Sequence, residues 1–156
     1  MVVIGIDPSE SKWLKYDESR MLLYDTVIRA GVGGCHLTDC FKERSFRKTP
    51  PDRRISQRGW NLEILREEID IIQPNGLIAI GVDAEKFLYD TDFARKYSIY
   101  PVIHFGAFHY HRVDEDAWKD RFRREFAGAV RGYKRYATKG EIEGLSEFLA
   151  SMPSFI

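Results

Sequence analysis

The chain has 156 residues, and its 24 basic residues balance its 24 acidic residues, so the formal net charge is zero. With 44% hydrophobic and 31% charged residues, the composition is typical of one globular domain over residues 1–156 and excludes a disordered chain. The sequence has no apolar run of membrane-spanning length and no basic-then-apolar leader. We therefore expect a cytoplasmic protein with no membrane partner.

The first apolar stretch is Val2 to Ile6, and Asp7 and Pro8 follow it. A β-branched apolar run that stops at Asp-Pro predicts a buried strand, because proline has no N–H for the next ladder bond. Open α/β folds bind ligands beyond the carboxyl ends of their strands. Asp7 is therefore the first candidate for a catalytic residue. The alternative is a turn carboxylate without a chemical role.

The rest of the chain alternates between helical and strand patterns. Helices are predicted at about 17–30, 60–73, 83–93, 114–129 and 141–150, and strands at 35–39, 77–80 and 99–104. Asp83 is a candidate N-cap, Asp114-Glu115-Asp116 is predicted to cap the long helix that begins there, and Pro101 predicts an edge strand. Strands that alternate with helices pair in parallel through right-handed crossovers. The sequence therefore predicts a three-layer α/β/α sandwich with a central sheet of about four parallel strands.

Basic residues gather between Lys42 and Arg58, where seven of them face only Glu43 and Asp52, a local excess of five charges. The seven are Lys42, Arg44, Arg47, Lys48, Arg53, Arg54 and Arg58. We predict a loop here of about twenty residues, a length that is typical of functional loops, and an anionic ligand. A second cluster comprises Arg121, Arg123, Arg124, Arg131, Lys134 and Arg135, and we interpret it as a solvated helix face.

Three polar side chains follow predicted strands, namely Asp7, Asp39 and His104, so all three should lie at one edge of the sheet. A carboxylate can stabilise a developing cation or orient water, and an imidazole can donate to a leaving group. This pairing suits cleavage at a sugar anomeric carbon. The plainer alternatives are an Asp39 that caps a loop or pairs with Lys42, and a His104 satisfied within the core.

Four stretches resemble motifs of the uracil-DNA glycosylase superfamily. Gly5-Ile6-Asp7-Pro8-Ser9 is similar to its first motif, a strand that ends in Gly-x-Asp/Asn/Glu-Pro. Pro101 to Arg112 resembles its last motif, a strand-end His that opens a loop wedging into DNA. Between them, Leu37–Lys42 resembles the strand with the base-reading residue, and Leu65–Ala84 the helix–strand–helix core. The resemblance spans about Val2 to Arg112.

The resemblance implies a metal-independent DNA glycosylase without a cofactor, whose partner is DNA, either single-stranded or a damaged duplex. Asp7 would orient water and stabilise the sugar cation, and His104 would hydrogen-bond the departing base. Asp39 would read the base, and Trp13 or Tyr16 would stack on it. The DNA contacts would be Lys42, Arg44, Arg47, Lys48, Arg53, Arg54, Phe108, Tyr110 and Arg112, with Phe108 or Tyr110 filling the gap left by the flipped nucleotide.

The sequence departs from the family pattern at several positions. Asp39 stands where Asn is usual, and an ionised carboxylate accepts hydrogen bonds but donates none. It would repel a uracil carbonyl oxygen, which leaves another damaged base, or lost activity, as alternatives. Phe105-Gly106 stands where Pro-Ser is usual. Two cysteines, Cys35 and Cys40, are too few for the four-cysteine iron–sulfur site of some branches.

Two other function classes stay open. Gly-Ile-Asp-Pro also begins junction resolvases of the RNase H type, in which the Asp binds Mg²⁺ beside other carboxylates. That fold requires an antiparallel meander directly after the first strand, whereas residues 17–30 have a helical pattern. The other class is a nucleic-acid-binding module that keeps the fold without the chemistry, and Asp39 favours it.

Overall fold

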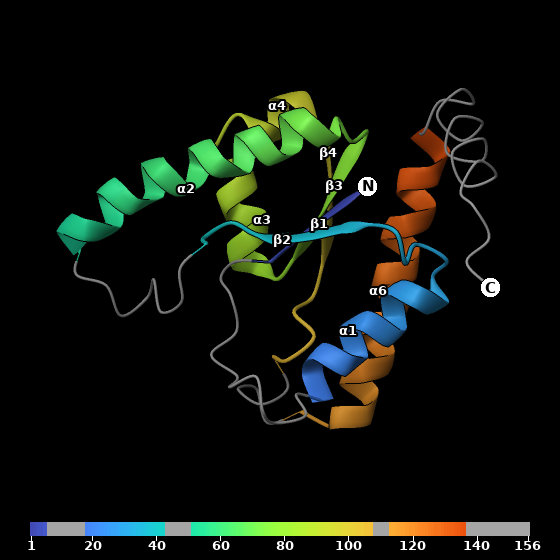
Figure 1. Cartoon of the computed structure of the whole chain (residues 1–156). Coiled ribbons are helices and arrows are strands. Elements are labelled where there is room, and N and C mark those ends of the chain that lie inside the picture. The colour runs from blue at the N-terminus through green and yellow to red at the C-terminus, as the bar shows by residue number, and fades with distance from the viewer. Residues whose placement is uncertain (6–17, 43–50, 108–112, 137–156) are drawn as a thin grey trace, which may run out of the picture.

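Figure 1 shows the computed structural model, which describes residues 1–5, 18–42, 51–107 and 113–136. Its strands are β1 (Val2–Gly5), β2 (His36–Asp39), β3 (Gly76–Ile80) and β4 (Ser98–Val102). Its helices are α1 (Glu18–Arg29), α2 (Pro51–Ile72), α3 (Val82–Tyr89), α4 (Phe93–Lys96) and α6 (Glu115–Tyr136). The predicted helix at 141–150 lies outside the described residues.

The four strands form one sheet in the order β2-β1-β3-β4, and every neighbouring pair is parallel. The central strands β1 and β3 are almost continuously apolar, because both of their faces are covered. Val2, Ile4, Leu77, Ile78 and Ala79 have no exposed surface. The predicted parallel sheet of about four strands is confirmed.

Helices cover both faces of the sheet, as Figure 1 shows. On one face, Ile4 and Leu77 pack with Leu65 of α2 and Leu88 of α3. On the other face, side chains of the sheet pack with Leu22 and Val27 of α1 and with Phe122 and Phe126 of α6. The three-layer α/β/α sandwich is therefore confirmed.

Of the predicted signals at the ends of elements, those for β4 and α6 are confirmed and the one for α3 is wrong. Strand β4 is an edge strand, which suits Pro101 because an edge tolerates a missing N–H. The Asp114 carboxylate accepts a hydrogen bond from the Ala117 N–H at 2.8 Å, which caps α6. Helix α3, however, begins after Gly81 rather than at Asp83, and Gly81 has φ +86°. Asp83 instead lies in the first turn of that helix.

The predicted loop between Asp39 and Trp60 is wrong in its second half, because α2 already begins at Pro51. Arg53 and Arg54 therefore belong to the first turns of a helix. Proline is favourable at the first helical position, since its φ is preset and its N–H is not needed there. The first turns of α2 extend past the rest of the molecule in Figure 1, which explains why they carry no apolar stripe.

The described helices include none that is both long and apolar enough to cross a membrane. The two longest, α2 and α6, each have 22 residues and are rich in charged side chains.

Helix α6 approaches the sheet closely at Gly132. A Cβ on Gly132 would lie 2.9 Å from Cε1 of Tyr100, whereas the nearest atom to a Cβ on Gly128 is an arginine nitrogen at 3.9 Å. We expect Gly132→Ala to lower the free energy of unfolding by about 1–3 kcal/mol through overpacking. Gly128→Ala, its matched control, should raise it by about 0.5–1 kcal/mol through helix propensity. Urea unfolding measures both, and equal effects of the two substitutions would contradict this packing.

Candidate functional site

The order of the strands singles out one position in the sheet. The chain leaves β1 through α1 toward β2, and leaves β3 through α3 toward β4 on the opposite side. Helices α1 and α3 cover opposite faces, so their connections diverge beyond the carboxyl ends of β1 and β3. Open α/β sheets bind their ligands at such a point of divergence. We call the carboxyl ends of the four strands, at Gly5, Asp39, Ile80 and Val102, the carboxyl edge.

Asp39 is the last residue of β2, as predicted, and it is in register with Gly5 of β1. A Cβ placed on Gly5 would collide with Oδ1 of Asp39, so the carboxylate occupies the space that a side chain there would fill. The ladder continues one residue further, because the Cys40 N–H donates to the Gly5 carbonyl at 2.9 Å. The Asp39 carboxylate therefore lies over the end of β1.

His104 lies two residues beyond the end of β4, so its strand is shorter than predicted. Its ring packs against Gly81, where a Cβ would be only 3.2 Å from Cβ and 3.5 Å from Cδ2 of His104. Gly81 also has φ +86°, a conformation that side chains disfavour. Both the backbone conformation and the imidazole therefore require glycine at position 81.

The backbone beside His104 fixes its tautomer. The Gly106 N–H donates to Nδ1 of the imidazole at 3.1 Å. A nitrogen that accepts a hydrogen bond carries no proton, so the neutral ring carries its proton on Nε2. The Phe105 ring stacks on the imidazole at 4.5 Å and is itself in edge contact with Phe122 of the core. The ring is thus oriented with Nε2–H as its donor.

Side chains of helix α6 hold the backbone at Ile103 and His104 in place. The Trp118 indole Nε1–H donates to the His104 carbonyl at 3.0 Å. The Ile103 N–H donates to Oε2 of Glu125 at 3.0 Å, and Nε of Arg121 holds the other carboxylate oxygen at 2.8 Å. Sequence reasoning missed Trp118 and Glu125 as positioning residues. The signal was available for Trp118 alone, because a partly buried indole N–H needs an acceptor.

Asp39 and His104 reach inward from the two outer strands toward the two central ones. The carboxylate lies over Gly5 of β1 and the imidazole over Gly81, which follows β3. Strands β1 and β3 are neighbours, and neighbouring strands are about 4.8 Å apart. The structure therefore brings two of the predicted site residues to adjacent strand ends, each above a glycine.

Most of the other predicted site residues lie outside the described residues. These are Asp7, Trp13, Tyr16, Arg44, Arg47, Lys48, Phe108, Tyr110 and Arg112. Arg53 and Arg54 are described only as positions in α2.

Lys42 forms structural contacts within the chain. Its ammonium group lies 2.7 Å from Oε2 of Glu68 and 2.5 Å from Oγ1 of Thr38, and only 17% of the side chain is exposed. Its backbone N–H donates at 2.6 Å to Oδ1 of Asn61, which is fully buried. These contacts fasten the end of β2 to α2. A DNA phosphate would therefore have to compete with Glu68 for this charge.

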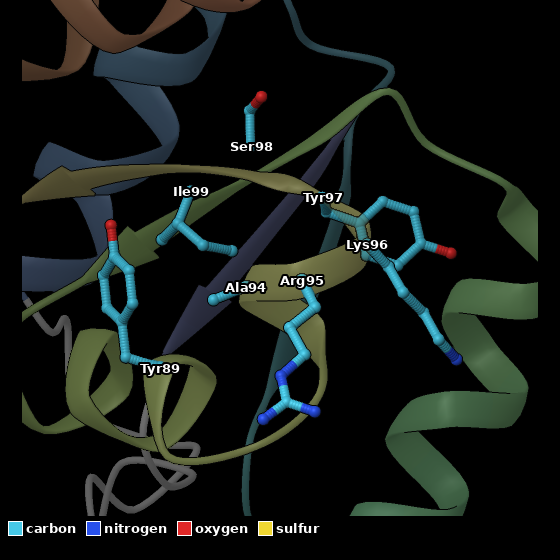
Figure 2. Close-up of a pocket in the computed structure, with 7 residues that line it drawn as sticks. All are labelled: Tyr89, Ala94, Arg95, Lys96, Tyr97, Ser98 and Ile99. Carbon is cyan, nitrogen blue, oxygen red and sulfur yellow. The ribbon is translucent and has the colours of Figure 1, made fainter.

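A hollow of about 490 Å³ lies elsewhere, where α4 leads into β4, and Figure 2 shows its lining. It is formed by Tyr89, Ala94, Arg95, Lys96, Tyr97, Ser98 and Ile99. Ser98 is the first residue of β4, so the hollow is at the opposite end of that strand from His104. The Arg66 guanidinium and the Lys96 ammonium lower the pKa of the nearby Asp92 carboxyl to about 2. Lys96 is thus engaged by a carboxylate, and none of the predicted site residues lines the hollow.

Within the described part of the chain, no three His, Cys, Asp or Glu side chains are grouped so as to hold a metal ion. No protein-family model and no curated protein matches the chain.

The contact between Trp118 and the His104 carbonyl gives a stability prediction. We expect Trp118→Phe to lower the free energy of unfolding by about 1 kcal/mol, because the indole donor is lost while an aromatic ring remains. Trp60→Phe is the control, since Trp60 is 48% exposed and should change stability by less than about 0.5 kcal/mol. Urea unfolding of both variants measures the two changes in the free energy of unfolding. Indistinguishable effects would show that the indole does not support His104.

Proposed function

We propose that the chain is a DNA glycosylase-like hydrolase, which flips a damaged base out of DNA and cleaves its N-glycosidic bond. The observation that carries the proposal is His104, fixed with Nε2–H as donor at the carboxyl edge. Such a donor stabilises the negative charge that a departing base acquires. The proposal includes DNA as the partner and a cytoplasmic location, which suits the free thiols of Cys35 and Cys40.

In this mechanism the bond between C1′ of the sugar and the base nitrogen breaks, and its electron pair leaves with the base. The sugar becomes an oxocarbenium-like cation, to which water adds, releasing a proton and leaving an abasic site. His104 donates from Nε2 to the base as its charge develops. Asp7 is the proposed group for the cation and the water. It follows Gly5 by two residues, and two residues of extended chain span at most about 7 Å.

The proposed substrate is uracil or another deaminated base. An ionised Asp39 accepts a hydrogen bond from a ring N–H or an amino group but repels a carbonyl oxygen. A base that turns an N–H toward Asp39 is therefore favoured over one that turns an oxygen toward it.

The magnesium-dependent nuclease is less well supported. It would require an antiparallel strand directly after the first, but β1 leads through α1 into β2, and both described neighbours of β1 are parallel to it. A binding module without catalysis would have the same fold as the glycosylase, so the fold does not distinguish the two. A test for base release does.

The first test is base release from oligonucleotides carrying uracil, hypoxanthine, xanthine or a mismatch, with EDTA present. Alkali-labile abasic sites should form, and His104→Ala should slow their formation by about 10²–10³-fold, because the charge on the base loses its donor. His36→Ala is the matched control and should retain activity, since His36 lies in β2 near Glu68, away from Gly81.

Each other outcome of this assay points elsewhere. Strand nicking in a parallel reaction that contains Mg²⁺ in place of EDTA, and only there, would favour the nuclease. Tight binding with no released base would favour the module. Equal losses in the two histidine variants would remove His104 from the mechanism.

A second test concerns the reading of the base. Asp39→Asn exchanges an acceptor-only group for an amide that also donates, so the preference for uracil over the other bases should rise roughly tenfold. Competition between labelled oligonucleotides in one reaction measures this ratio. An unchanged ratio, with activity retained, would show that Asp39 does not contact the base.

A further inference from the structure

The outward face of α6 carries cationic side chains between Arg124 and Arg135. Arg124, Arg131, Lys134 and Arg135 are all exposed, whereas Phe126 and Val130 of the same stretch are buried in the core. The sequence pattern predicted a solvated basic face here, and the exposure confirms it. The question is whether this face has a ligand.

Three basic residues in the first half of the helix are matched by acids on neighbouring turns. Lys119 pairs with Glu115 at 2.5 Å, Arg121 with Glu125 at 2.8 Å, and Arg123 with Asp120 at 3.0 Å. Among the described residues, no acid pairs with Arg124, Arg131 or Arg135. Within residues 113–136 the positive charge of these three guanidinium groups is therefore not balanced by an acid, which makes them a candidate site for an external anion.

The three arginines form a row, which we call the α6 arginine row. Their spacings of seven and four residues place them on one side of a helix, within about 40° of each other, over about 16 Å of its length. Small residues, Ala127 and Gly128, lie between the first and second arginine. Arg131 folds back along the helix, so that its Nη2 is 3.9 Å from the place of a Cβ on Gly128. The Arg131 guanidinium therefore lies close to the helix surface beside Gly128, where a linear anion along the row would meet it.

Guanidinium groups match phosphate oxygens through two parallel hydrogen bonds, which makes arginine better suited than lysine to this contact. A nucleic acid strand presents a phosphate about every 3.4 Å of duplex axis, so the row faces several phosphates at once. A membrane surface fits less well. Helices that lie on bilayers insert an apolar face, and the apolar face of α6 is buried against the sheet.

We propose that the α6 arginine row binds the phosphodiester backbone of a nucleic acid, independently of base sequence. This surface is additional to the carboxyl edge, and the proposal does not require that the edge cleaves anything. The same helix joins the two surfaces, because its first half holds Ile103 and His104 through Glu125 and Trp118.

The test compares two double variants that remove equal charge. Arg131→Gln with Arg135→Gln removes two members of the row. Lys86→Gln with Arg95→Gln removes two exposed charges from α3 and α4, on the other side of the sheet. Binding of an undamaged 20-nucleotide duplex is measured by fluorescence anisotropy at several salt concentrations. In the row variant the slope of log affinity against log salt should flatten by about 2, and affinity at low salt should fall at least about tenfold.

The control variant should keep the slope of the unmodified protein. Equal flattening in both variants would overturn the proposal, because net charge rather than the row would then carry the binding. Failure of the unmodified protein to bind the duplex would also overturn it, as would row-dependent binding to phosphatidylserine vesicles in place of DNA. The duplex holds no damaged base, so an inactive glycosylase leaves this result unaffected, and loss of base release with normal binding contradicts only the proposed function.

Discussion

The packing of the His104 imidazole against Gly81 is the contact on which the site depends. Three structural elements meet there, since Gly81 follows β3 and precedes α3, while His104 follows β4. The Gly81 N–H also donates to the Val102 carbonyl at 2.8 Å, which ties the two strand ends together. A side chain at position 81 would push the ring away and strain the backbone. Glycine there positions the imidazole over the divergence point of the sheet.

The two faces of helix α6 have different roles. Its buried face supplies Phe122 and Phe126 to the core, and in its first half Trp118 and Glu125 hold the backbone of His104 and Ile103. Its outward face carries the α6 arginine row. One rigid helix therefore connects the stability of the core, the orientation of the imidazole and the proposed contact with a phosphate backbone.

The sequence predicts the central strands well, because runs such as 77–80 are apolar throughout, as a strand covered on both faces must be. It fails at the start of α2, because residues 51–59 show no helical stripe of apolar residues in the sequence. The support of His104 could be predicted only in part: the indole N–H of Trp118 needs an acceptor, but the choice of the His104 carbonyl, 14 residues away, depends on tertiary folding. The ion pair between Lys42 and Glu68, which are 26 residues apart in the sequence, could likewise not be predicted, because it depends on where α2 packs.

The proposed mechanism requires that His104 is held as an Nε2–H donor at the carboxyl edge. Long-range ¹H–¹⁵N correlation spectra of the ¹⁵N-labelled protein test it directly at pH 8, above the ordinary histidine pKa of about 6.5. The His104 signals are assigned by their loss in His104→Ala. We expect a protonated Nε2 and an unprotonated, hydrogen-bonded Nδ1. A proton on Nδ1, or rapid exchange between the two tautomers, would contradict it.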